Sequence, residues 1–154
     1  MNMKDLSITS TDHSDLFKDI HFIIEKARSE VAIAVNSTLV LVNWHIGNRI
    51  NQEILKNERA EYGEEVIRKT SRFLTAEYGR GYSLTNIFNM VKFSAIFLDV
   101  KIVQTLSGKL SWSHFVELIY LDDQTKRDFY AEVARLENWS VRTLKEKINS
   151  MMFE

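Results

Sequence analysis

A long apolar pattern, uninterrupted by proline, runs from Ser14 to Lys56. Its centre, residues 31–46, reads VAIAVNSTLVLVNWHI, and five polar residues interrupt it: Asn36, Ser37, Thr38, Asn43 and His45. A run of this kind is compatible with a buried strand or a buried helix. Its length favours the helix, because strands usually stop at about eight residues. We therefore predict a long central helix with residues 31–46 buried.

The flanks of this centre support the helical interpretation. Apolar residues recur there at three- and four-residue steps, as expected for one helical face: Leu16, Ile20, Ile23, Ala27, Leu39, Val42, Ile46, Ile50 and Ile54. At 1.5 Å per residue an unbroken helix would span roughly 60 Å, more than the diameter of a small domain. We expect it either to kink near Asn36-Ser37 or to extend to meet a partner.

The composition predicts an all-α protein. The 154 residues include no proline and only five glycines, so little interrupts long helices. We expect a flexible leader over residues 1–12, which are rich in Ser, Thr and Asp, and a single helical domain over 13–154. There is no cysteine, which excludes disulfides and thiolate metal ligands, and we expect no metal site and no cofactor.

Charge and hydropathy narrow the possible partners. The formal net charge is −1, so any contact with nucleic acid has to come from a local patch. The first fifteen residues contain no apolar segment of the kind found in signal peptides. Residues 31–46 are too short and too interrupted to cross a bilayer. We expect a soluble, cytoplasmic protein without membrane contact.

The rest of the chain predicts further helices that are separated by capping signals. Ser83, Ser111 and Ser140 are good N-caps, as is one of Asp122 and Asp123. Gly79-Arg80-Gly81 predicts a tight turn, with Gly79 at positive φ. The expected helices cover about residues 64–78, 83–98, 102–106, 112–121, 124–137 and 141–150.

Four uncommon blocks occur in order along this chain: W-x-I-G at 44–47, NERAEYG at 57–63, GRGYS at 79–83 and LSWSH at 110–114. With them, residues 16–148 resemble the N-terminal domain of the YhcG-like family, which is assigned to the PD-(D/E)XK nucleases. In that family a separate nuclease domain follows, and it would begin where this chain ends at Glu154. The resemblance implies a nuclease-associated helical module whose neighbour is the nuclease domain and which is not itself an enzyme.

The residues themselves offer no convincing catalytic group. Asp99-Val100-Lys101 imitates the D-x-K half of a nuclease site, but it follows a predicted helix and is interpreted as that helix's C-terminus. No two histidines stand at helical metal-binding spacing, so we interpret His45 as a buried core residue and His114 as structural. No catalytic and no metal-binding residue is therefore predicted.

The best functional candidate is the unit 64–98, which has the form of a helix-turn-helix. In it Arg80 and the free amides from Ser83 onward could hold a phosphate. The predicted DNA-binding residues are Arg80, Ser83, Thr85, Asn86, Asn89 and Lys92. Of these, Asn86 and Asn89 would read adenine edges and Lys92 would meet the DNA backbone. The alternative is that this unit is a packing hairpin without DNA contact.

The other class of function is a protein-interaction module that forms a homodimer. Its support is a surplus of apolar positions on the first and third helices, since an exposed apolar stripe usually marks an interface. The predicted interface residues are Ile50, Ile54, Met90, Phe93 and Phe97. The two classes are compatible, because helix-turn-helix proteins commonly bind DNA as dimers.

Overall fold

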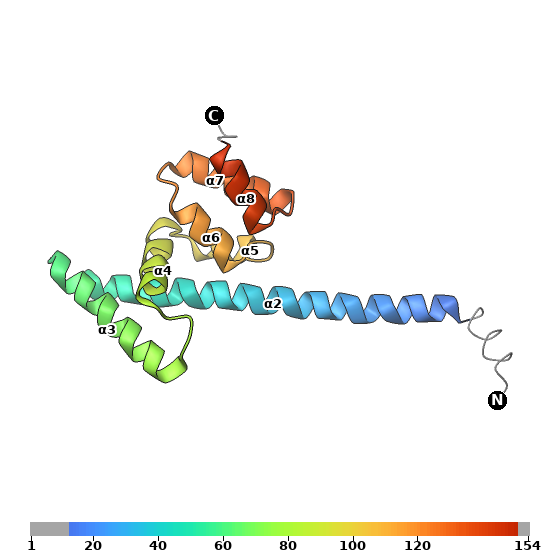
Figure 1. Cartoon of the computed structure of the whole chain (residues 1–154), viewed down its shortest axis with the longest axis horizontal. Coiled ribbons are helices and arrows are strands. Elements are labelled where there is room, and N and C mark those ends of the chain that lie inside the picture. Colours follow the sequence, from blue (N-terminus) through green and yellow to red (C-terminus); the bar gives the residue numbers. More distant parts are fainter. Residues whose placement is uncertain (1–12, 151–154) are drawn as a thin grey trace. The chain divides into compact units, whose positions relative to one another are not determined.

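A computed structural model describes residues 13–150, and within this range it contains seven helices and no strand (Figure 1). The all-α prediction is confirmed. The helices are α2 (Ser14–Ile54), α3 (Ala60–Tyr78), α4 (Leu84–Ile96), α5 (Val100–Leu106), α6 (Trp112–Ile119), α7 (Gln124–Leu136) and α8 (Val141–Asn149). The expected leader, residues 1–12, lies outside the described residues.

The capping signals place most helix starts correctly. Ser83, Ser111 and Ser140 each accept a hydrogen bond from the backbone N–H three residues ahead, as does Asp123 at the start of α7. Asp99 is a correction: its carboxylate accepts from the Lys101 N–H and begins α5 rather than ending the helix before it. Residues 60–63 differ too, because they open α3, whereas the expected helix began at about residue 64.

Helix α2 is continuous through Asn36-Ser37, where a kink was one of two expectations. The described residues form two compact units, one ending at Val35 and the other beginning at Asn36. The polar pair serves the second unit. Asn36 Nδ2 donates to the carbonyls of Ser107 and Leu110 at 2.9 and 3.0 Å, and Ser37 Oγ lies 2.7 Å from Ser107 Oγ.

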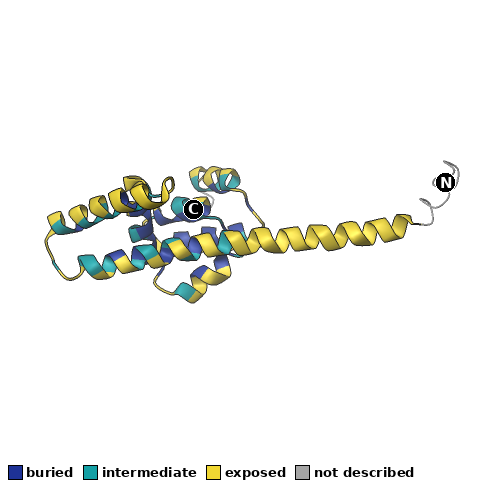
Figure 2. Ribbon diagram, turned by 90° about the horizontal axis from the view of Figure 1, so that it is seen from below, coloured by how far each residue is buried: buried dark blue, intermediate teal, exposed yellow. Residues whose placement is uncertain are grey.

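The predicted burial of residues 31–46 is wrong. Only Val40 and Trp44 in that stretch are buried, and Val31 and Leu39 are 62% and 58% exposed. Residues 14–35 are exposed without exception (Figure 2). From residue 36 onward, α2 packs through one face, and apolar residues on its other faces stay in solvent. Apolar content identified the helix, but it could not identify which face is covered.

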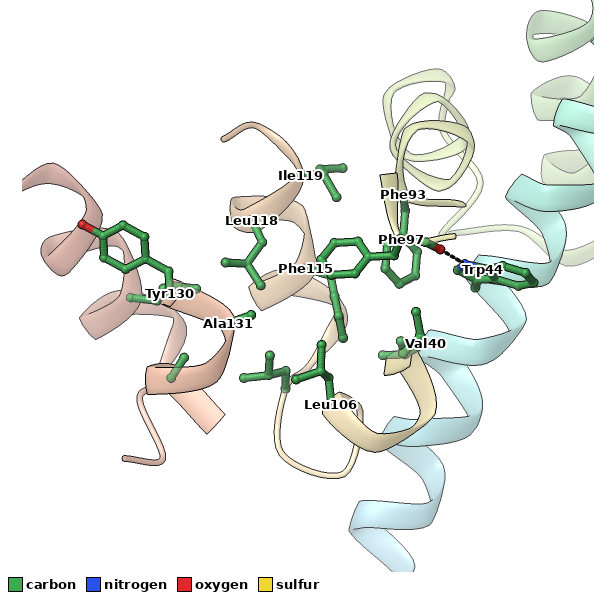
Figure 3. Close-up of a cluster of buried hydrophobic side chains, with 14 of the residues drawn as sticks. Val40, Trp44, Phe93, Phe97, Leu106, Phe115, Leu118, Ile119, Tyr130 and Ala131 are labelled. Atoms are coloured by element: carbon green, nitrogen blue, oxygen red, sulfur yellow. Dashed lines mark hydrogen bonds between the residues drawn. The ribbon is translucent and has the colours of Figure 1, made fainter. Parts of the chain in front are cut away.

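The core of the second unit lies where residues 40–54 of α2 meet α4 and α6 (Figure 3). Phe93, Phe97 and Phe115 form an aromatic cluster with ring centroids 4.9–5.5 Å apart. The indole Nε1 of Trp44 donates to the Phe97 carbonyl at 2.7 Å. The cluster continues to α7 and α8 through Tyr130 and other buried side chains: Leu118, Ile119, Ala131, Ala134 and Leu144.

The close approach of α2 and α4 explains Gly47, the glycine of the W-x-I-G block. A Cβ atom built there would lie 1.9 Å from the Met90 carbonyl oxygen, so α2 and α4 approach each other too closely for any side chain. Asn51 supports the same crossing, because its Nδ2 donates to the Val91 carbonyl and to Ser94 Oγ. The crossing fixes the position of α4, the proposed recognition helix.

Candidate functional site

The turn between α3 and α4 has the predicted tight geometry. Gly79 and Gly81 adopt φ values of 81° and 104°, which side-chain-bearing residues rarely reach. The carbonyl of Tyr82 accepts hydrogen bonds from Ser71 and Thr75 of α3 at 2.7 and 3.2 Å. Helices α3 and α4 are therefore held in a fixed hairpin, as the helix-turn-helix interpretation requires.

The two asparagines of α4 are not available to read bases. The Asn86 side chain donates to the Gly81 carbonyl and accepts from Trp112 Nε1 at 2.9 Å. Asn89 is only 6% exposed, and its side-chain oxygen accepts from the Tyr120 hydroxyl. Adenine readout needs both the oxygen and the nitrogen of a free amide. The structure thus gives both residues a structural role, and neither fits the predicted base contact.

The other four predicted DNA-binding residues divide into two pairs. Arg80 and Thr85 are exposed and extend into solvent from the turn and from the first turn of α4. Ser83 Oγ caps α4, and Lys92 is half-buried with its Nζ 4.5 Å from the centre of the Tyr120 ring. Arg80 is therefore the one cation of the predicted set that could reach a phosphate without rearrangement.

The electrostatics of α3 do not extend a positive surface from Arg80. A groove of about 330 Å³ on this helix is lined by three acids and three bases, Glu61, Glu64, Glu65, Arg68, Lys69 and Arg72. Lys69 Nζ lies 2.8 Å from the Glu65 carboxylate, and this hydrogen bond holds the pKa of that carboxyl below its ordinary value. The mixture of acids and bases differs from the basic stripe that usually binds duplex DNA.

Most of the predicted interface residues lie inside the protein's own core. Ile50, Met90, Phe93 and Phe97 are between 0 and 8% exposed, and Ile54 is half-buried against the smaller cluster of α2, α3 and α4. The apolar surplus on the third predicted helix is used up by packing against α2 and α6. These positions are therefore not open to a partner.

Exposed apolar surface occurs instead in the first part of α2, and it includes the beginning of the stretch 31–46 whose burial was predicted. Within residues 14–35 nine large apolar side chains are between 43 and 67% exposed: Leu16, Phe17, Ile20, Phe22, Ile23, Ile24, Val31, Ile33 and Val35. A second, smaller surface is a groove of about 470 Å³ between α3 and α4, where Leu84 and Phe88 are about half exposed. Regular apolar spacing before residue 31 was the signal that marked the first surface.

Residues 13–150 contain no group of three or more His, Cys, Asp or Glu side chains placed to hold a metal ion. His114 is structural as predicted: one ring nitrogen contacts Ser111 and the other lies 2.7 Å from the Trp139 carbonyl. His45, in contrast, is exposed, so its interpretation as a core histidine is wrong. In the same part of the chain no helix is long and apolar enough to cross a membrane.

Comparison with known proteins places these features in a family. The model of the DUF1016 N-terminal domain matches residues 19–154. A curated relative, the "Putative nuclease YhcG" of Escherichia coli (strain K12), is 27% identical over 176 aligned positions. The match covers 95% of this chain but 47% of the relative, so the chain spans about half of that protein's length. No solved structure matches. The chain therefore belongs to the DUF1016 N-terminal domain family.

Proposed function

We propose that this chain is a non-catalytic helical module that acts by binding protein, including a second copy of itself, beside the nuclease domain of the full-length family protein. The observation that carries the proposal is the exposed apolar surface of residues 14–35. The largest apolar patch on a typical monomer covers about 300–600 Å² and is itself often functional. Nine half-exposed large side chains on one segment of 22 residues reach or exceed that range, which favours an interface.

DNA reading by α4 is the weaker proposal. The two residues predicted to read bases, Asn86 and Asn89, form hydrogen bonds within the fold instead. What still favours DNA is the exposure of Arg80 in the turn and of Arg68 and Arg72 on α3. Contacts from such arginines would bind phosphate without regard to sequence, and their affinity would fall steeply with salt.

Fluorescence anisotropy with a labelled random duplex at low ionic strength separates the two functions. We expect no salt-sensitive binding by the wild-type chain at micromolar concentrations. Binding that weakens with salt and loses about one unit of salt slope in Arg80→Ala would overturn the protein-binding proposal and support the DNA module. Thr85→Ala, an exposed neighbour without charge, is the control for effects of mutation alone.

The absence of catalysis is a separate part of the proposal. Asp99 is engaged at the start of α5, where its carboxylate accepts from the Lys101 N–H at 2.9 Å. We expect no degradation of plasmid DNA with Mg²⁺ or Mn²⁺, as measured by gel electrophoresis of the purified chain. Metal-dependent cleavage that disappears in Asp99→Ala would show that this triplet is catalytic after all.

A further inference from the structure

Residues 17–34 of α2 carry a heptad pattern that the core of the protein does not use. If Phe17 is placed at position a, the a positions are Phe17, Ile24 and Val31, and the d positions are Ile20, Ala27 and Ala34. All six residues are exposed. The charged residues of 14–35 fall at the other positions: Asp15, Lys18, Asp19, Glu25, Lys26, Arg28 and Glu30. An uncharged a/d stripe with charges outside it is the pattern of a helix that pairs with another helix.

The size of this surface is close to what a stable pair requires. Seven of the nine exposed apolar side chains lie at positions a, d, e or g, the exceptions being Phe22 at f and Ile33 at c. The seven together present on the order of 650 Å², against the roughly 800 Å² that each partner of a standard interface buries. The segment is 22 residues long, which gives roughly 33 Å of helix for contact. A partner helix of the same length would cover the a/d stripe over its whole extent.

The sizes of the side chains indicate both the partner and its direction. In an antiparallel pair, position a of one helix packs against position d of the other. Centring such a pair between Glu25 and Lys26 gives three kinds of layer: Phe17 against Ala34, Ile20 against Val31 and Ile24 against Ala27. Two of the three layers set a large residue against alanine, and facing large and small residues is how helices fill the space between them.

The alternative direction fits less well. In a parallel pair each residue meets its own copy, so two Phe17 side chains would crowd one layer while Ala27 and Ala34 would leave two layers underfilled. The antiparallel arrangement also sets the helix dipoles in opposite directions. At the flanking e and g positions it places Arg28 near His21 and Glu30 near Ile23, so that no two acids face each other.

From these observations we infer that residues 17–34 pair in antiparallel fashion with the same segment of a second copy of this chain. The inference rests on the proposed protein-binding function and names its partner and contact surface. The pair is isologous, since each a residue of one copy meets a d residue of the other and the reverse. It also gives a use to apolar residues that would otherwise remain in solvent.

Cross-linking tests the direction of pairing. Because the chain has no native cysteine, a thiol reagent can react only with the cysteines that are introduced. Ile20→Cys and Val31→Cys chains, one of them ¹⁵N-labelled, are unfolded together, refolded and treated with a short bifunctional thiol reagent. Antiparallel pairing places residue 20 beside residue 31 of the other copy, and like residues roughly 16 Å apart along the axis. We expect mixed-mass pairs, with the link between residues 20 and 31, at least tenfold in excess over like pairs. Like pairs in excess would overturn the antiparallel arrangement.

A matched pair of substitutions tests the surface itself. Ile24, at position a, and Ile33, at position c, are 46 and 45% exposed, so they differ in position and hardly at all in burial. By light scattering we expect Ile24→Glu to raise the dissociation constant of the dimer at least tenfold and Ile33→Glu to change it less than threefold. Equal effects would contradict the heptad surface and leave the protein-binding function standing. A wild-type chain that stays monomeric, together with Ile20→Cys and Val31→Cys chains that form no cross-links, would contradict both.

Discussion

At the scale of single residues, Gly47 is the glycine with the least room for a side chain. The Met90 carbonyl carbon and oxygen lie within 2.4 Å of where a Cβ atom would be, and backbone cannot move aside as a flexible side chain can. Gly47→Ala must therefore push α2 and α4 apart. We expect it to lower the free energy of unfolding by about 2–3 kcal/mol, as measured by urea denaturation.

Gly63 is the natural control for this prediction, because it too is a buried glycine within a helix. A Cβ atom there would lie 3.4 Å from Ile54 Cγ2, which is an ordinary contact. Gly63→Ala should raise the free energy of unfolding by up to about 1 kcal/mol, because alanine is the better helix former. Destabilisation of equal size in both variants would contradict the close approach of α2 and α4.

Asn86 provides a second residue-scale test, and it reverses what the sequence suggested. Its side chain joins the Gly81 carbonyl to the indole N–H of Trp112, so Asn86→Ala would leave both groups without this partner. We expect a loss of about 1–3 kcal/mol in the free energy of unfolding. The neighbouring Thr85→Ala, at an exposed position, should stay within about 0.5 kcal/mol of wild type. A stable Asn86→Ala would restore this residue as a candidate for base contact.

At the scale of elements, α2 combines two kinds of helix in one continuous segment. From residue 36 onward it has buried side chains and hydrogen bonds from Asn36, Trp44 and Asn51 to the rest of the second unit. Residues 14–35 have no buried side chain. Most of the stability of a helix in a protein comes from tertiary packing of its apolar face, which this segment lacks within one chain. Its stability should therefore depend on association, whereas that of residues 40–50 should not.

Hydrogen exchange measured by mass spectrometry at two protein concentrations tests this difference. We expect backbone amides in residues 17–34 to exchange at least tenfold more slowly at high concentration, where the chain is paired. Amides of residues 40–50 should exchange equally slowly at both concentrations, because they depend on the core of one chain. Protection of residues 17–34 that does not change with concentration would argue that the segment is stable without a second copy.

The helices also show which features of the fold could be predicted from the sequence. Caps and turns could be predicted because they are local: Ser83, Ser111 and Asp123 bond to amides three residues ahead, whatever packs around them. Burial depends on which other helices lie against a face, and apolar periodicity does not contain that information. For this reason the sequence pattern located α2 and α4 but did not show which of their faces are buried. Residues 31–46 were predicted to lie in the core and Phe93 at an interface, whereas most of the former are exposed and the latter is buried.

The hydrogen bonds of Asn86 and Asn89 within the fold could not be predicted for a related reason. Short polar residues near the start of a helix have the same sequence signature whether they read bases or close a fold. Only the positions of Trp112 and Tyr120, which lie 26 and 31 residues further along the chain, show that the amide oxygens of Asn86 and Asn89 are engaged. The four family blocks, by contrast, could be recognised in the sequence. The glycine of W-x-I-G, for example, reflects a steric requirement of the helix crossing.

At the scale of the whole molecule, the chain matches 47% of the relative named "Putative nuclease YhcG". In our account the second unit provides the folded core, and residues 14–35 provide the contact with a second copy. Association of this kind would bring two copies of any domain that is joined to the module close together. A paired module would therefore act on a joined nuclease domain by raising its local concentration rather than by chemistry of its own.

The solution mass of the wild-type chain tests this account most directly. Light scattering coupled to size-exclusion chromatography, with loading from about 1 to 100 µM, should show the mass rising from 18.0 kDa towards twice that value. The concentration at the midpoint gives the dissociation constant against which Ile24→Glu and Ile33→Glu are compared. A mass of 18.0 kDa at every concentration would contradict the account, because the apolar surface of residues 14–35 would then stay in solvent without a second copy.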